Sequence, residues 1–235
     1  QCRLPRILFA AALVAVAVGA TLAAQAENAY YILEGQALDA KLGAYTASVP
    51  DVNGDGVDDL VSGNHRIDGP AGTDAGRVVL FDGATGKQLW KVEGEQAGAL
   101  MGHDVWGIGD VDNDGRGDVL ASAYRYSYPG HPGAGKVYML SGKDGKELWH
   151  YAGKETGDEI GYALCAVPDL DNDKVPDVLA GAWLHDQTGA NAGRLYVLSG
   201  KDGKLIRTHD GVAAGDRLGC SAAGFSDLDG DGYGD

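Results

Sequence analysis

The sequence predicts an all-β protein built from copies of one four-stranded unit, and three observations predict it. An acidic motif of the form DxDxDGxxD begins at Asp51, Asp110, Asp169 and Asp227, at nearly equal intervals along the chain. A hairpin pattern of β-branched and aromatic residues around a glycine-bearing turn follows each of the first three motifs. No long window beyond the N-terminal apolar segment has helical periodicity. A recurring unit at a constant interval is typical of repeat architectures.

Each repeat supplies four strands in the same order. The first leads from an apolar–glycine pair into the acidic motif, and the second leaves the motif as a short apolar run such as DVLASA. A polar, glycine-rich stretch of varied sequence follows, and the last two strands form the hairpin. The apolar–glycine pairs are Leu42–Gly43, Met101–Gly102, Ile160–Gly161 and Leu218–Gly219.

Four antiparallel strands in about 60 residues are the content of one β-propeller blade. We expect a signal peptide at 1–26 and a propeller segment at 27–235, with repeats at 42–100, 101–159, 160–217 and a truncated one at 218–235. This amounts to about three and a half blades, fewer than the roughly 4 to 8 of closed propellers, so we expect an incomplete propeller.

The acidic motif predicts a calcium site, because oxygens at alternate positions of a curled loop suit a hard cation. Side chains at positions one, three, five and nine would be the ligands, together with a backbone carbonyl near Val57, and Gly56 permits the tight turn. The predicted side-chain ligands are Asp51, Asn53, Asp55 and Asp59; Asp110, Asp112, Asp114 and Asp118; Asp169, Asp171, Asp173 and Asp177; and Asp227, Asp229, Asp231 and Asp235.

Other metals and other loops fit this motif less well. Zinc is disfavoured because the loops contain no His or Cys, and magnesium holds its water too tightly to prefer such a cage. An EF-hand needs a glutamate at position twelve, where this chain has Ser62, Ala121 and Ala180. The simpler alternative is a solvated Asp/Asn/Gly turn, which four copies at one spacing disfavour. Lys174 replaces the glycine of the third loop, so we expect that site to bind most weakly.

These features resemble the FG-GAP repeats of the integrin α-subunit N-terminal β-propeller and its bacterial relatives. The resemblance rests on the apolar–glycine pairs, the DxDxDGxxD loops and the small-residue pairs that start at Gly63, Ser122 and Gly181, although Phe of "FG" and Pro of "GAP" are missing. It covers the chain from about position 30 to the end. The resemblance implies a seven-bladed propeller in the complete protein, with calcium between strands and partner recognition on other loops.

Charge and the N-terminus suggest an exported protein. Arg3 and Arg6 precede an apolar run that ends at Ala24-Gln25-Ala26, which is typical of a cleaved secretory signal, with an uncleaved membrane anchor as the alternative. The chain has 34 acidic and 19 basic residues, which disfavours a nucleic-acid partner. We therefore expect a secreted, periplasmic or cell-surface protein that binds an extracellular protein or glycan ligand and does not insert into membranes after signal removal.

A quinoprotein-like propeller enzyme is the alternative function, since the turns before Trp90 and Trp149 resemble those of pyrroloquinoline-quinone propeller repeats. The third copy has Arg207 in the place of the tryptophan. A propeller fused to an enzyme domain outside residues 1–235 is a further alternative. We expect no catalytic residues in this chain, because its histidines do not share a repeat position and no catalytic arrangement of acids can be recognised.

Three smaller features need an interpretation. Arg116-Gly117-Asp118 spells a tripeptide that integrins bind, but Asp118 belongs to the metal loop, so we expect no recognition role. Tyr124, Tyr126 and Tyr128 are a candidate contact surface, with packing against their own blade as the alternative. Cys165 and Cys220 are expected as buried free thiols, with a single disulfide as the alternative. We expect most histidines on the surface or in loops.

Overall fold

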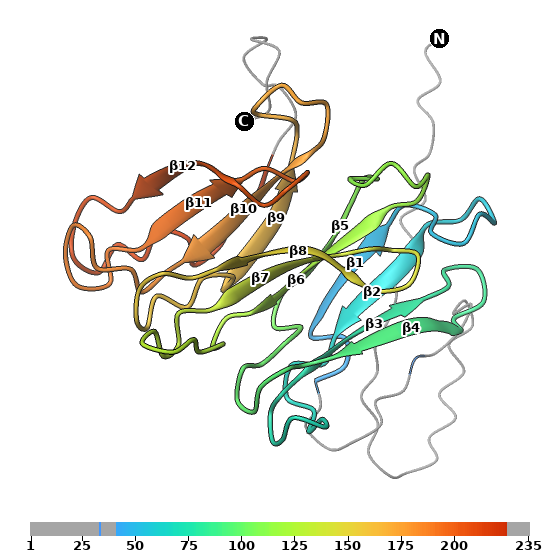
Figure 1. Ribbon diagram of the computed structural model, residues 1–235, viewed down its shortest axis with the longest axis horizontal. Helices are drawn as coiled ribbons and strands as arrows, with labels where there is room; N and C mark the ends of the chain where they lie inside the picture. The colour runs from blue at the N-terminus through green and yellow to red at the C-terminus, as the bar shows by residue number, and fades with distance from the viewer. Residues whose placement is uncertain (1–32, 34–40, 225–235) are drawn as a thin grey trace, which may run out of the picture.

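The computed structural model describes residue 33 and residues 41–224, and these contain twelve strands and no helix (Figure 1). The strands form three four-stranded antiparallel sheets, in which each strand pairs with the next along the chain. The predicted all-β fold with four strands per repeat is confirmed. The first sheet contains β1 (Tyr45–Val49), β2 (Asp59–Gly63), β3 (Arg77–Phe81) and β4 (Gln88–Glu93); the second contains β5 (Val105–Ile108), β6 (Asp118–Ala123), β7 (Lys136–Leu140) and β8 (Glu147–Ala152); the third contains β9 (Ala163–Val167), β10 (Asp177–Ala182), β11 (Arg194–Leu198) and β12 (Leu205–Asp210).

Burial differs between the strands in the way that stacked sheets require. Strands β6 and β7 are buried along their whole length, because neighbouring sheets cover both of their faces. This explains the continuous apolar runs in the sequence. The fourth strands are partly exposed, and β12 alternates between exposed and half-buried residues.

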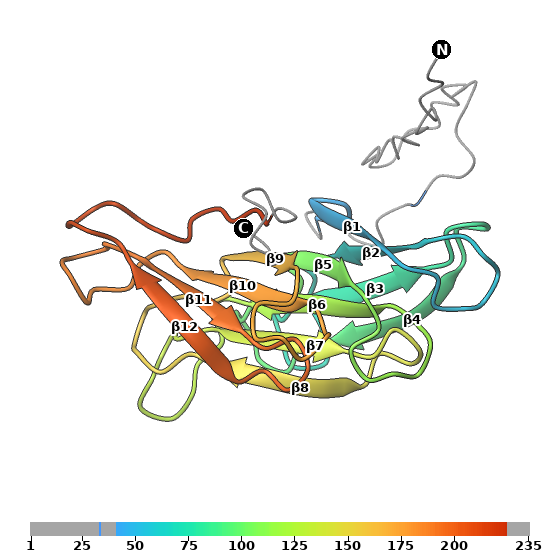
Figure 2. The ribbon, with the colours of Figure 1, turned by 90° about the horizontal axis from the view of Figure 1, so that it is seen from above.

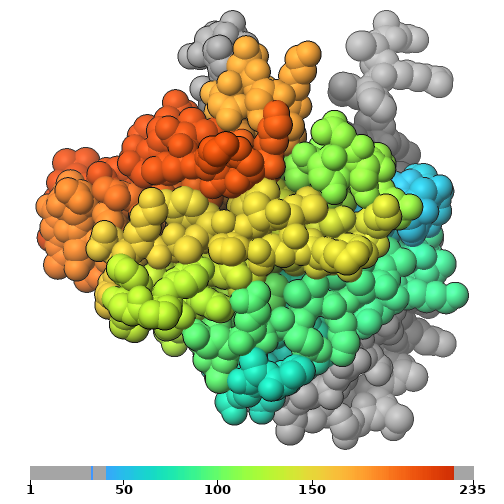
Figure 3. Space-filling model, viewed as in Figure 1, coloured from blue at the N-terminus to red at the C-terminus, as the bar shows by residue number. Residues whose placement is uncertain are grey.

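The sheets pack face to face in chain order, and the second lies between the first and the third (Figures 1 and 3). The first strands meet at one side of the stack, where β1 contacts β5 and β5 contacts β9 (Figure 2). The fourth strands lie at the opposite edge of each sheet. One apolar cluster fills the space between sheets one and two, and a second fills the space between sheets two and three. This is the arrangement of propeller blades, and the described part does not close into a ring.

Close backbone contact between blades explains the glycine of the apolar–glycine pair. Gly102 has a φ angle of 80°. A Cβ added to Gly63 of the preceding sheet would lie only 3.1 Å from the Cα of Gly102. The same Cβ would lie 1.9 Å from the Gly102 carbonyl oxygen, so neither glycine can carry a side chain. Gly181 and Gly219 repeat this contact further along the chain.

Two tryptophans join successive sheets. Trp90 of β4 donates its indole N–H to the carbonyl oxygen of Gly142 at 2.6 Å. Trp149 of β8 donates in the same way to Gly200 at 2.7 Å. Each ring also lies against a second glycine of the same hairpin, Gly145 or Gly203, both with positive φ. Trp90 and Trp149 therefore dock each of the first two sheets onto the next one.

The cysteines differ from the expectation in one respect. Both are free, and Cys165 is buried in β9 as expected. Cys220 is exposed, because it follows Gly219 at the outer side of the third sheet, where no further described residue covers it.

Among the described residues there is no helix of the length and hydrophobicity that crossing a bilayer requires.

Most of the six histidines are surface or loop residues, as expected, since His131, His150 and His209 are exposed and only His103 and His185 are buried. Of the two interpretations of the tyrosines, Tyr124 follows the packing alternative, because it is buried against His103 of its own repeat. Tyr124 follows the last residue of β6 directly, so its ring turns into the junction between sheets. There His103 also contacts the rings of Tyr45, His65, Tyr124 and Tyr162, at centroid distances of 4.7, 5.5, 4.2 and 5.0 Å.

The burial of His103 predicts a pH-dependent stability. Burial, with a smaller contribution from the charge of His65, lowers the pKa of His103 from 6.5 to about 4. Between these values the unfolded chain binds more protons, so this contribution to stability is present above pH 6.5 and is lost as the pH falls toward 4. Between about pH 7.5 and about pH 4.5, the unfolding free energy of the parent protein should fall by about 2 to 3 kcal/mol more than that of His103→Phe.

Urea unfolding of both proteins at the two pH values measures this difference. The same pH dependence in His103→Phe and in the parent protein would show that His103 is not the group responsible.

Candidate metal centres

The acidic loops lie at the same place in all three sheets, in the connection between the first and second strands. The last paired residues of these strands are Val49 with Asp59, Ile108 with Asp118, and Val167 with Asp177. The ninth loop residue therefore begins the second strand. The fourth predicted loop, with Asp227, Asp229, Asp231 and Asp235, lies outside the described residues, as does the predicted signal peptide.

The first-position aspartate organises each loop by accepting backbone N–H groups. One carboxylate oxygen of Asp51 accepts from Gly54 at 2.6 Å, and the other accepts from Gly56 at 2.8 Å. The second and third loops repeat the bond to position six, from Gly115 to Asp110 at 2.8 Å and from Lys174 to Asp169 at 2.7 Å. These bonds curl the backbone of each loop around its first-position carboxylate.

The side-chain oxygens of the loops lie close together. One ligand atom each from Asp110, Asp112 and Asp114 fall within 4.8 Å of one another, and the same holds for Asp169, Asp171 and Asp177. The first loop has Asn53 at position three, so it carries one carboxylate fewer. At position seven Val57 exposes 43% of its surface, which suits a residue that would contribute only its carbonyl.

The ninth-position aspartate has a structural role that the motif alone did not reveal. Both of its carboxylate oxygens accept backbone N–H groups, one from position two of its own loop and one from the hairpin between the third and fourth strands. Asp118 accepts from Val111 and from Gly142, both at 2.9 Å, and it is fully buried. The hairpin donors in the three sheets are Gly83, Gly142 and Gly200.

These three glycines are the site residues that sequence analysis missed. They recur at the same nearly constant interval as the acidic loops, so the repeat contained the signal. A Cβ on Gly142 would lie 1.8 Å from the carbonyl oxygen of Gly117 in the acidic loop, so only glycine fits. Because Gly142 also accepts the indole N–H of Trp90, one residue connects an acidic loop to the neighbouring sheet.

Burial also changes the acidity of the ninth position. It raises the pKa of Asp118 and of Asp177 to about 6, against the opposing effect of the backbone N–H groups, and neighbouring loop carboxylates raise it further. Burial raises the pKa of Asp59 as well. The half-buried Asp51 has a lowered pKa, chiefly because it accepts the N–H of Gly56. The first loop thus combines a first-position carboxyl group whose pKa is lowered with a ninth-position carboxyl group whose charge an added cation would stabilise.

The sixth loop position requires a left-handed backbone in all three loops. Its φ angles are 84° at Gly56, 88° at Gly115 and 74° at Lys174. Only glycine adopts this conformation without strain, so Lys174 is strained relative to the other two.

A second lysine differs between the loops. Lys143 Nζ lies 3.9 Å from Asp114, and Lys201 Nζ lies 3.7 Å from Asp173. Both lysines come from the hairpin of the same sheet, at the position that Ala84 occupies in the first sheet. A lysine ammonium group therefore lies near the fifth-position carboxylate in loops two and three.

The Arg-Gly-Asp tripeptide has no free aspartate to present. Asp118 is fully buried, and Arg116 donates from Nη1 to the carbonyl oxygen of Val52 at 2.6 Å. The charged groups of Arg116 and Asp118 thus both form hydrogen bonds within the stack of sheets.

Three stacked four-stranded meanders, each with one acidic loop and the first two with a tryptophan that docks on the next sheet, define a protein of the β-propeller class. The chain belongs to the family described as outer membrane protein assembly factor BamB (PQQ_2), whose model matches residues 11–175 and 74–221.

The resemblance to the FG-GAP propeller of integrin α subunits is confirmed by curated relatives. Integrin alpha-E of Homo sapiens is 34% identical over 160 residues, and integrin alpha pat-2 of Caenorhabditis briggsae is 33% identical over 160 residues. They match 61% and 58% of this chain. Integrin alpha-5 of Xenopus laevis is 28% identical over 81% of this chain. The chain covers only 13% to 19% of the length of these three relatives.

Two solved structures show weaker similarity. BamB from Moraxella catarrhalis aligns with a TM-score of 0.35 at 17% identity, over 64% of this chain and 34% of its own. The rhamnogalacturonan lyase YesW aligns with a TM-score of 0.47 at 21% identity, over 80% and 38%. Both TM-scores are too low to establish a common overall fold.

Proposed function

We propose that this chain is part of a secreted, calcium-binding β-propeller that acts as an adhesion module or binds a protein or glycan ligand. The observation that carries the proposal is the recurrence of one hydrogen-bonded cage of oxygens at the same place in three successive sheets. The oxygen atoms that would coordinate the metal belong to carboxylates, one amide and a backbone carbonyl, and calcium prefers oxygen ligands of these kinds. The relatives with integrin names support an extracellular location and a binding role.

The proposed ligands are the residues of positions one, three, five and nine, with the carbonyl of position seven. Calcium would supply a charge that balances three or four acidic groups in each loop. The cation would also hold the loop against the second strand, which the ninth-position aspartate begins. Because the ninth-position aspartate also holds the hairpin glycine, a bound ion would stabilise the joint between sheets as well as the loop.

Chelation tests this proposal directly. A ligand that binds only the folded state adds about 2.7 kcal/mol per site at a hundredfold excess over its dissociation constant. The thermal midpoint should therefore fall markedly when EGTA removes calcium, and it should recover when calcium is restored. A midpoint that is the same with calcium and with EGTA would rule the proposal out.

A quinone-dependent enzyme is a second candidate, favoured by the tryptophan turns at Trp90 and Trp149. These turns have a sufficient structural role in joining sheets, so we favour a non-catalytic module. Absorption spectroscopy of the purified full-length protein separates the two, because a bound quinone absorbs where the apoprotein does not.

The third loop should gain from removal of its strained side chain. Lys174→Gly should stabilise the calcium-free protein by about 1 kcal/mol, because glycine adopts the left-handed backbone without strain. It should also raise the calcium affinity of that loop, since a positive charge leaves the cage. Asn172→Gly is the matched control, because Asn172 also has positive φ but is uncharged. Calorimetry that finds the same third-site affinity in Lys174→Gly and the parent contradicts the assignment.

The hairpin lysines should weaken calcium binding in loops two and three. Lys143→Ala and Lys201→Ala should each raise the affinity of their own loop by about two- to fivefold, the size expected for an exposed charge pair. The reciprocal change Ala84→Lys should lower the affinity of the first loop by a similar factor. Site-resolved calcium titration by NMR measures all three, and an unchanged first loop in Ala84→Lys would refute the competition.

A further inference from the structure

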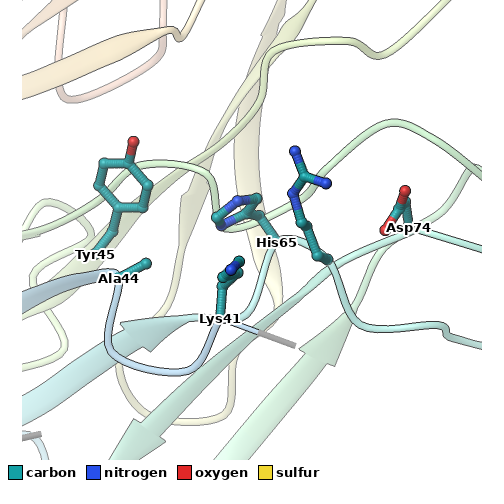
Figure 4. Close-up of a pocket in the computed structure, with 6 residues that line it drawn as sticks. Lys41, Ala44, Tyr45, His65 and Asp74 are labelled. Atoms are coloured by element: carbon teal, nitrogen blue, oxygen red, sulfur yellow. The ribbon is translucent and has the colours of Figure 1, made fainter. Parts of the chain in front are cut away.

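A polar pocket lies at the end of the first sheet opposite its acidic loop (Figure 4). Tyr45 begins β1, whereas the acidic loop follows the end of that strand, and His65 lies just beyond the end of β2. The pocket has a volume of about 630 Å³. In Figure 4 the His65 side chain lies between Tyr45 and Asp74. The lining residues are Lys41, Ala44, Tyr45, His65, Arg66 and Asp74.

Arg66 is exposed in this pocket and lacks the acidic partner that the next repeat provides. Its counterpart Arg125, at the equivalent position of the next repeat, lies 3.3 Å from a carboxylate oxygen of Glu159. The position equivalent to Glu159 in the first repeat is Leu100. Within the described residues Arg66 forms no ion pair, although Asp74 lines the same pocket. The pocket therefore contains a guanidinium that is free to bind an anion.

His65 supplies a hydrogen-bond donor beside Arg66. Burial, together with the charges of Arg66 and Lys41, lowers the pKa of His65 below 6.5, so the ring is neutral at about pH 7. Its Nδ1 is buried and has no partner among the described residues. A proton on Nδ1 would be an unsatisfied buried donor, so the neutral ring carries its proton on Nε2. That nitrogen forms no hydrogen bond within the described part of the chain and is available to a ligand.

Tyr45 adds an apolar surface to these donors. Its hydroxyl is already used, because it lies 3.2 Å from Nε2 of His103. This contact and the ring contacts with His65 and His103 fix the phenol ring at the side of the pocket. A flat apolar group beside the ring would gain the burial energy of an aromatic pair.

We propose that this pocket binds the carboxylate of a small aromatic or other ring-bearing organic acid, with Arg66 and His65 donating to the carboxylate and Tyr45 packing against the ring. A planar carboxylate matches the two parallel N–H groups of a guanidinium. Asp74 opposes a second negative charge, so the pocket should prefer monocarboxylates.

The test uses benzoate and its uncharged isostere benzamide with the full chain. Benzoate should shift the His65 ring resonances in NMR spectra in a saturable way, whereas benzamide should bind at least about tenfold more weakly. Arg66→Met should weaken benzoate binding by about tenfold or more. Arg125→Met is the matched control, because Arg125 occupies the equivalent place but is already paired. Asp74→Asn should tighten binding.

Equal binding of benzoate and benzamide would overturn the proposal. So would benzoate binding that Arg66→Met and Arg125→Met weaken to the same extent. Arg66 is exposed, so its replacement should leave the fold intact, and unchanged resonances of the buried tyrosines would verify this.

Discussion

Asp118→Ala is expected to lower stability even when no calcium is present. The substitution leaves the N–H groups of Val111 and Gly142 without an acceptor in a buried place. Each unsatisfied group costs about 1 to 3 kcal/mol, so the loss of two acceptors should lower the unfolding free energy by about 2 to 6 kcal/mol in EGTA. The calcium site of the second loop should be lost as well.

Asp112→Ala separates the two roles of the loop. Asp112 is exposed and accepts only the N–H of Asp114, at 3.0 Å. Its removal should therefore abolish calcium binding in the second loop while changing the calcium-free stability by less than about 1 kcal/mol. Denaturant unfolding with EGTA and with calcium measures both variants. Equal stability of the two variants in EGTA would show that Asp118 is a ligand without a structural role.

Trp90→Ala is expected to have the largest effect on the joint between the first two sheets. Trp90 exposes only 9% of its surface, packs in the apolar cluster between sheets and donates to Gly142. Truncating a buried aromatic residue of this size costs about 3 to 5 kcal/mol. Trp106→Ala is the matched control, because Trp106 is 40% exposed in β5 and its loss should cost much less.

Combining the two changes tests whether loop and joint act together. Asp118 and Trp90 both hold Gly142, one through its N–H and one through its carbonyl. Groups that share a partner have non-additive effects, so the double variant should lose less stability than the sum of the single losses. Strict additivity would mean that Gly142 does not couple the acidic loop to the neighbouring sheet.

The repeat was sufficient to predict the strands and the acidic loops. The nearly constant spacing of the acidic motifs identified the unit, and the apolar runs after each loop became the buried second strands. The sequence also indicated that Gly56 needs a special backbone conformation, and its φ of 84° agrees with this. These features depend on residues that are close together in the sequence, so the sequence alone is sufficient to predict them.

Features that depend on contacts between sheets were predicted less well. His65 and Tyr124 occupy the same position in successive repeats, yet only the stacking of sheets shows that each meets a ring of the next repeat, His103 or Tyr162. Tyr124 therefore looked like part of a surface with Tyr126 and Tyr128. The second role of Asp118 was hidden for the same reason, since Gly142 is distant in the sequence and is brought to it only by the sheet.

Isothermal calorimetry of calcium binding tests the central claim most directly. The purified chain, treated with EGTA and then dialysed, should bind calcium at more than one site and should bind magnesium much more weakly. Asp110→Ala and Asp51→Ala should each remove one site from the stoichiometry. No saturable heat with calcium, or an unchanged stoichiometry in both variants, would contradict the assignment of the acidic loops as calcium sites.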